Sequence, residues 1–210
     1  MRLLYFIFQG FCHQIPERAL AVGGFAMPLC ARCAGMYVGL FAGLPLSLLL
    51  VRLGKSLRRR PLYVLVAASA ALWGADGIGN LLDCLHTPNA GRFALGMLLG
   101  LSLSPLIVRM FAREAGAEAA EGPGGGFMAP AIAAAAAGGG LLNVYPARAL
   151  LVAESVAAFA GLVMFLATIH AGVVLAVSRN LRTRAAFTIA GATASAQILF
   201  LSSVRGFLGI

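Results

Sequence analysis

The sequence predicts an all-α integral membrane protein, a polytopic bundle of about six transmembrane helices with a short N-terminal segment at the membrane interface. Two observations predict this class. Hydrophobic residues make up 60% of the 210 residues and charged residues only 11%, with a mean hydropathy of +0.91. A soluble domain carries about 25% charged residues. In addition, apolar stretches close to the roughly 20 residues that a transmembrane helix needs recur along the chain. Most of the surface is therefore expected to face lipid.

The apolar stretches define the predicted elements in order. Residues 3–11 are too short to span and are expected to lie at the membrane interface or on the bundle. The fourth predicted span is the shortest and consists mainly of alanine and glycine. The six predicted spans are residues 34–51, 62–82, 92–111, 127–142, 149–177 and 185–204.

Basic residues predict the orientation of these helices. The chain carries a formal net charge of +9, but without the interleaved aromatic residues of a nucleic-acid platform, so no nucleic-acid partner is expected. Positively charged loops favour the cytoplasmic side of a membrane. This places the N-terminal cysteines and residues 83–91 on the extracytoplasmic side of the cell membrane. Ten basic residues lie in the first, third and fifth loops: Arg52, Lys55, Arg58, Arg59, Arg60, Arg109, Arg113, Arg179, Arg182 and Arg184.

The composition changes along the chain and suggests three parts. Residues 1–111 contain all four cysteines and three predicted spans, and we expect them to carry the function. Residues 112–126 are rich in glycine and glutamate and form a predicted cytoplasmic loop. Residues 127–210 are rich in alanine and are expected to supply supporting transmembrane helices.

Three of the four cysteines occur in the first 33 residues. Cys30 and Cys33 are separated by two residues, so both sulfur atoms can face one ion, and thiolate with imidazole suits zinc or another thiophilic metal. The expected ligands are Cys12, Cys30 and Cys33, with His13 or His86 as the fourth. Side chains of the adjacent Cys12 and His13 diverge in regular structure, so both bind one ion only in an irregular turn.

Two other interpretations of the cysteines stay open. They could be ordinary buried residues. Alternatively, Cys30 and Cys33 could form a disulfide, because a helix N-terminus and the positive charge of Arg32 favour the thiolate, and the extracytoplasmic side permits disulfides. In that case the protein is a thiol–disulfide oxidoreductase that passes electrons to a membrane quinone.

Polar residues on the second predicted span form a second candidate feature. Asp76, Asn80 and Asp83 share one helical face. A charged residue in a membrane helix costs about 2.5–3.5 kcal/mol on insertion scales, so Asp76 needs compensation. Arg92, at the start of the next span, is the expected partner, unless Asp76 points into a wet cavity; the pair could also be purely structural.

Glycines at four-residue spacing predict how the helices pack. The first span contains Gly35, Gly39 and Gly43, and the third contains Gly96 and Gly100. This pattern lets helix backbones approach closely. We therefore expect the first and third spans to be in contact, which would gather the polar residues of the first three spans.

These residues resemble a known family. A first block between Cys12 and Gly39 and a second block between Asp76 and Gly100 resemble the signature of a family. This family is domain of unknown function family 2085 (DUF2085), which consists of predicted small prokaryotic membrane proteins. The resemblance covers about residues 5–111. It departs at Gly79 and Asn80, where the family favours Thr-Gln, and it does not include Cys84 or His86. The blocks are Cys12-His13-Gln14-Ile15-Pro16-Glu17-Arg18 with Pro28-Leu29-Cys30-Ala31-Arg32-Cys33-Ala34-Gly35-Met36-Tyr37-Val38-Gly39, and Asp76-Gly77, Asn89, Arg92, Gly96, Gly100.

The resemblance implies candidate residues and architecture but no reaction. The implied site residues are Cys12, His13, Cys30 and Cys33 for metal, and Asp76, Asn89 and Arg92 as a polar site. Three hypotheses follow: a metal site, a quinone-linked thiol–disulfide oxidoreductase, and a transporter or lipid-handling protein using Asp76 and Arg92. The sequence does not decide whether the protein is an enzyme or whether it forms homo-oligomers; the lipid bilayer is its expected partner.

Overall fold

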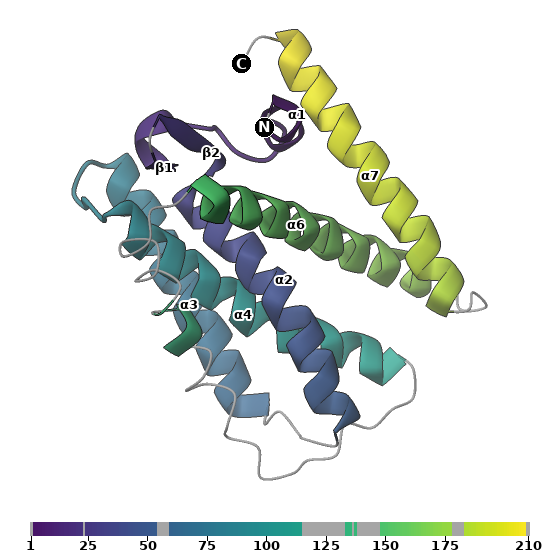
Figure 1. Ribbon diagram of the computed structural model, residues 1–210. Helices are drawn as coiled ribbons and strands as arrows, with labels where there is room; N and C mark the ends of the chain where they lie inside the picture. The colour runs from purple at the N-terminus through teal and green to yellow at the C-terminus, as the bar shows by residue number, and fades with distance from the viewer. Residues whose placement is uncertain are drawn as a thin grey trace.

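The protein is a helix bundle with a small β-hairpin at one end (Figure 1). The computed structural model describes residues 2–22, 24–53, 59–114, 133–135, 137, 148–177 and 183–208. Five long helices form the bundle: α2 (Ala31–Arg52), α3 (Arg59–Leu81), α4 (Asn89–Glu114), α6 (Arg148–Val177) and α7 (Thr183–Leu208). The predicted all-α fold class is confirmed.

Within the described residues, four helices are long and apolar enough to cross a membrane: Ala31–Arg52, Arg60–Leu81, Asn89–Phe111 and Arg148–Val174. They correspond to the first, second, third and fifth predicted spans. The fourth, 127–142, lies mostly outside the described residues. The sixth, 185–204, falls on α7, which has 26 residues but is not among the four. The count of about six spans is therefore not confirmed.

The N-terminal region contains short elements that precede the first long helix. Helix α1 (Arg2–Phe8) is followed by the 3₁₀ turn η1 (Pro16–Arg18) and by strands β1 (Ala19–Val22) and β2 (Phe25–Cys30). The strands pair antiparallel, with Ala19 opposite Cys30 and an irregularity between Ala19 and Ala21. Gly24, with φ of 78°, makes the turn between them, a backbone conformation in which glycine is favoured. The hairpin was not predicted from the sequence.

Helices α2 and α4 pack at very short range, as the glycine pattern predicted. A Cβ atom added to Gly35 would meet the backbone carbonyl of Phe93, and one added to Gly96 would meet that of Arg32. The same holds for Gly161 of α6, which lies against the backbone of Tyr37 on α2. Only hydrogen fits in these contacts, so the glycines fix α2 against both neighbours.

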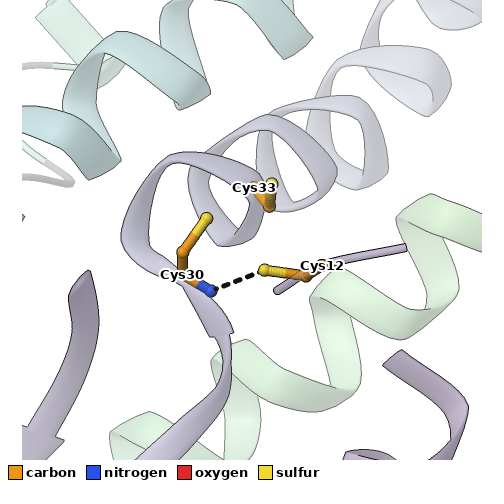
Figure 2. A group of neighbouring side chains, drawn as sticks. All are labelled: Cys12, Cys30 and Cys33. Carbon is orange, nitrogen blue, oxygen red and sulfur yellow. Dashed lines mark hydrogen bonds between the residues drawn. The ribbon is translucent and has the colours of Figure 1, made fainter. Parts of the chain in front are cut away.

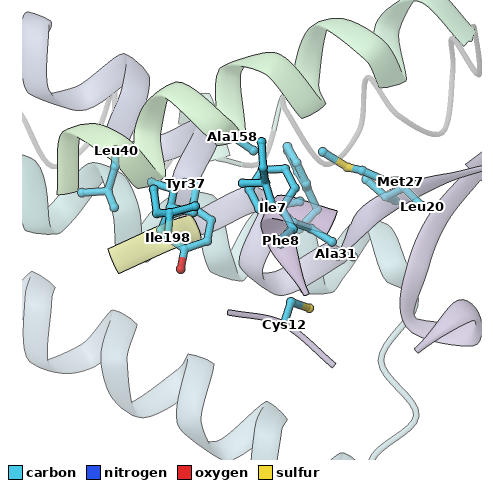
Figure 3. Packing of buried hydrophobic residues seen from close by; sticks show 14 of the residues in the cluster. Ile7, Phe8, Cys12, Leu20, Met27, Ala31, Tyr37, Leu40, Ala158 and Ile198 are labelled. Carbon is cyan, nitrogen blue, oxygen red and sulfur yellow. The ribbon is translucent and has the colours of Figure 1, made fainter. Parts of the chain in front are cut away.

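We call one end of the bundle the cysteine end. It carries α1, the hairpin and the first turns of α2, α4 and α6 (Figure 1). The C-terminal half of α7 also reaches it, because Ser202 donates a hydrogen bond to the carbonyl of Ile7 at 2.7 Å. A buried apolar cluster joins α1, β2, α2, α6 and α7 there, and Cys12 is part of it (Figure 3). The N-terminal segment is thus built into the bundle.

Candidate metal centre and the adjoining polar chain

The structure brings together three cysteines from three segments (Figure 2). Cys12 lies in the loop after α1, Cys30 is the last residue of β2, and Cys33 lies in the first turn of α2. Their three sulfur atoms lie within 4.8 Å of one another. Cys12 and Cys30 are 18 positions apart in the sequence, so this arrangement is a product of the fold and not of local spacing alone.

Several hydrogen bonds hold the loop that carries Cys12. The backbone N–H of Cys12 donates to the Phe8 carbonyl at 3.0 Å, which continues the end of α1. Gln14 has a positive φ of 51° and donates to the carbonyls of Tyr5 at 2.8 Å and Pro28 at 3.0 Å. Arg205 of α7 donates to the Cys12 carbonyl at 3.2 Å. The loop is therefore fixed to α1, to β2 and to α7.

The surroundings of Cys12 favour a thiolate. The backbone N–H of Cys30 donates to the sulfur of Cys12 at 3.2 Å. Hydrogen bonds from the thiols of Cys30 and Cys33 hold the pKa of Cys12 well below its usual value, against the opposing effect of burial. The same hydrogen bond to Cys12 raises the pKa of Cys30, because it stabilises the donating thiol. These contacts favour negative charge on the Cys12 sulfur, and the cluster lies at the N-terminus of α2, where the helix dipole is positive.

The sulfur spacing fits a thiophilic ion. With metal–sulfur bonds of about 2.3 Å, the sulfur atoms of a trigonal or tetrahedral site lie about 3.8–4.0 Å apart. Sulfur atoms within 4.8 Å of one another reach that spacing through small side-chain movements. Cys12 is buried, and Cys30 and Cys33 are partly buried. Three thiolates in an apolar setting select soft or borderline ions such as zinc.

The histidines expected as a fourth ligand lie outside this group. His13 is exposed, and the mutually close ligand atoms come from the three cysteines. His86 is exposed and forms an ion-pair contact with Asp83 at 3.3 Å. Cys84 is also exposed, with its sulfur 3.4 Å from the Gly79 carbonyl. As the structure stands, the cluster offers three protein ligands from the described residues.

The partner of Asp76 differs from the prediction. Asp76 is buried, and its Oδ2 atom lies 3.5 Å from Nε of Arg32 and not beside Arg92. The Arg32 guanidinium lies over the ring of Trp73, 5.4 Å from the ring centroid. A side chain at Gly77 would collide with it. Arg32 lies in the first turn of α2 at the cysteine end, so it is as well placed along the bundle as Arg92 to pair with Asp76.

Arg92 joins the same network through Asn80. The Asn80 side chain donates to Oδ1 of Asp76 at 3.0 Å and accepts a hydrogen bond from Arg92. Arg92 also donates to Asn89 at 3.3 Å, and Asn89 donates to the carbonyls of Glu17 and Ala19. The network, which we call the polar chain, consists of Arg32, Trp73, Asp76, Asn80, Arg92 and Asn89.

Arg32 and Gln14 were missed as site residues by the sequence reasoning. Arg32 stands between Cys30 and Cys33, and successive residues of a helix point about 100° apart. The cysteines therefore face the metal cluster while Arg32 faces α3. Two features of the sequence could have indicated that Arg32 is a site residue: it lies inside the cysteine motif, and a glycine, Gly77, follows Asp76. Arg32 and Cys33 lie in the same turn of α2, so this turn connects the polar chain to the metal cluster.

Comparisons with known proteins agree with this description. Residues 12–106 match the family described as "Predicted membrane protein (DUF2085)". An uncharacterized protein of Methanocaldococcus jannaschii is 28% identical over 108 residues, which cover 51% of this chain and 68% of that protein. An uncharacterized protein of Methanothermobacter thermautotrophicus is 29% identical over 100 residues, 47% of this chain and 86% of that protein. No solved structure matches the chain significantly. Residues 12–106, which hold the three clustered cysteines and the polar chain, thus match the DUF2085 family of predicted membrane proteins.

Proposed function

We propose that this membrane protein binds one thiophilic metal ion, zinc or a similar ion, through Cys12, Cys30 and Cys33. The observation that carries the proposal is the convergence of three sulfur atoms within 4.8 Å from a loop, a strand end and a helix start. A metal ion would tie these three segments together. Since metal binding stabilises only the folded arrangement, it would also stabilise the N-terminal region.

A tetrahedral site needs a fourth ligand. We propose His13, which follows Cys12 directly, or a water molecule in that position. His13 reaches the cluster only if its side chain and the turn at Gln14 change conformation. The variant His13→Ala separates the two cases: it lowers metal affinity if the imidazole is a ligand and leaves it unchanged if water fills the position.

The test is elemental analysis of protein purified without chelators, together with thiol counting. We expect about one metal ion per chain in the wild type and none in Cys30→Ser, because two thiolates hold the ion poorly. Cys84→Ser is the matched control, since Cys84 is exposed and lies outside the cluster. Metal-free wild-type protein that has been kept reduced, or unchanged metal content in Cys30→Ser, would contradict the proposal.

The oxidoreductase alternative gives a different result in the same preparation. Two thiols would become a disulfide and release two electrons and two protons, which a quinone would take up to form a quinol. Trapping of free thiols would then detect a mixture of oxidised and reduced Cys30–Cys33. The metal proposal predicts that both thiols react fully with an alkylating reagent after the ion has been removed. The removal is done anaerobically and without a reducing agent.

We also propose that the cysteine end faces the extracytoplasmic side of the cell membrane. The support is the basic first loop at the opposite end of α2, with Arg52 and Arg60 exposed there. A membrane-impermeant maleimide applied to intact cells is expected to label the exposed Cys84. It should not label Leu53→Cys in a Cys84→Ser background. The reverse labelling pattern would invert the orientation, and labelling of both would contradict the arrangement of the first spans.

A further inference from the structure

The polar chain contains several polar atoms that lack partners. Among the described residues, the buried side-chain atoms without a hydrogen-bond partner include Nε1 of Trp73, Oδ2 of Asp76 and Nε of Arg92. Leaving such an atom unsatisfied destabilises the folded protein, because the atom loses the hydrogen bonds that it would make with water in the unfolded chain. Asp76 is only 4% exposed, so bulk water does not solvate Oδ2, which has the 3.5 Å ion pair with Arg32 but no hydrogen bond. Three such atoms in one network point to a bound polar group.

The unsatisfied atoms define the chemistry of that group. Trp73 and Arg92 offer N–H donors and need acceptors, whereas Oδ2 of Asp76 is an acceptor and needs a donor. Trp73, Asp76 and Asn80 lie at intervals of three and four residues, so they share one face of α3. Arg92 reaches this face through its hydrogen bond to Asn80. The missing group must therefore offer several acceptor atoms and at least one donor.

The charges favour an anion. Arg18 also reaches this region and donates to the Asn80 carbonyl at 3.4 Å. Three arginines thus contact this network: Arg32 pairs with the Asp76 carboxylate, whereas Arg18 and Arg92 donate to Asn80. Helix α4 begins at Asn89 without an acidic residue in its first turn, so its N-terminus adds positive potential. Within the polar chain and Arg18, the arginines outnumber the single carboxylate of Asp76, which favours an anion.

We propose that the polar chain binds a phosphate group that is accompanied by a hydroxyl or ammonium donor. Phosphate oxygens accept from Trp73 and Arg92, and the donor satisfies Asp76. Inorganic phosphate carries this donor as its own hydroxyl, and a lipid headgroup carries it on the glycerol or ethanolamine. Arg18 and Arg32 are partly exposed, so the network extends to the surface at the cysteine end, where both aqueous solutes and headgroups are present. This site is separate from the metal cluster.

The single tryptophan of the chain makes the proposal directly testable. Trp73 fluorescence reports on this site alone. Detergent-solubilised protein is titrated with inorganic phosphate, and nanodiscs of phosphatidylcholine are compared with nanodiscs containing phosphatidylglycerol. We expect a saturable emission change. A response to phosphate identifies a solute site, and a response only to phosphatidylglycerol identifies a headgroup site. No saturable response in either arm would overturn the proposal and leave ordered water as the occupant.

Variants separate binding from folding. Arg92→Gln should weaken binding at least about tenfold, because a hydrogen bond to a charged group contributes about 1.5–3 kcal/mol. Arg18→Gln should also weaken it, and it disturbs the fold less because Arg18 makes one long hydrogen bond here. Arg60→Gln, exposed at the opposite end, is the charge-matched control and should bind normally. Unchanged affinity in both Arg18→Gln and Arg92→Gln would contradict the proposal.

Two further readouts keep this inference apart from the metal site. Trp73→Phe removes the indole N–H and keeps an aromatic ring under Arg32, so ligand-induced thermal stabilisation should shrink in that variant. The titration repeated on Cys30→Ser should give an unchanged response. Loss of the metal in Cys30→Ser with an intact phosphate response would show two independent sites. Loss of the response in Cys30→Ser would contradict their separation.

Discussion

The two ends of the helix bundle use their arginines differently. At the cysteine end, Arg18, Arg32, Arg92 and Arg205 donate to or pair with oxygen atoms within the chain, and the Arg148 guanidinium lies 4.3 Å from the centroid of the Phe25 ring. At the opposite end, Arg52 and Arg60 are exposed. The first group holds the structure together, and the second is available to the surroundings. A count of positive charges on each side of the membrane treats these two groups alike, although their contacts in the folded protein differ.

The largest expected effect comes from breaking the buried ion pair. Arg32→Gln leaves Asp76 buried without its charged partner, and loss of one partner of a buried pair costs about 3–5 kcal/mol. We expect a decrease of that size in the free energy of unfolding, measured by denaturant titration in detergent. Arg60→Gln removes the same charge from the opposite end and should change stability by less than about 0.5 kcal/mol.

Two outcomes would contradict this difference. Equal stabilities of Arg32→Gln and Arg60→Gln would mean that arginines at the two ends play equivalent roles. A much larger loss in Arg92→Gln than in Arg32→Gln would restore Arg92 as the main partner of Asp76. A double variant, Arg32→Gln with Asp76→Asn, should recover part of the stability, since it removes both charges.

A smaller effect is expected at the close contact between α2 and α4. Gly96→Ala places a methyl group against the Arg32 carbonyl, so the helices must separate, and overpacking of this kind costs about 1–3 kcal/mol. Gly74→Ala is the matched control, because a Cβ there has no neighbour within 4 Å. It should be neutral or stabilising by up to about 1 kcal/mol. The same denaturant titration in detergent serves both variants, and equal effects would refute the close packing.

The smallest effect concerns the bond between α7 and the cysteine loop. Arg205 donates to the carbonyls of Gln9 at 2.6 Å and Cys12 at 3.2 Å. Arg205→Gln should cost about 1 kcal/mol and lower metal affinity about tenfold, because residues behind a ligand orient it. Competition with a metal-binding dye measures the affinity. Arg52→Gln serves as the control, and an affinity that falls equally in both variants would assign the effect to overall charge.

The sequence allowed much of the fold to be predicted, because long apolar stretches and glycine spacing are local signals. The hairpin escaped detection. Its strands have four and six residues, and they lie directly beside the apolar residues that begin the first long helix. Too few residues alternate there to separate a strand from the end of a membrane helix. The fold class was therefore predictable and this connection was not.

Only part of the candidate site could be predicted from the sequence, and the reason is physical. The spacing of Cys30 and Cys33 limits where their sulfur atoms can lie, and Cys12 was grouped with them by clustering in the sequence. The exposed position of His13 follows the divergence of adjacent side chains. The partner of Asp76 was not predictable, since Arg32 and Arg92 both start helices at the same end and only tertiary packing distinguishes them.

The central claim is that three cysteine thiolates hold one metal ion, and X-ray absorption at the edge of the bound metal tests it most directly. The account predicts about three sulfur neighbours at about 2.3 Å in the wild type and in Cys84→Ser. In Cys33→Ser it predicts fewer sulfur neighbours and a lower metal content. A first coordination shell of nitrogen and oxygen alone, or an unchanged sulfur shell in Cys33→Ser, would contradict the claim.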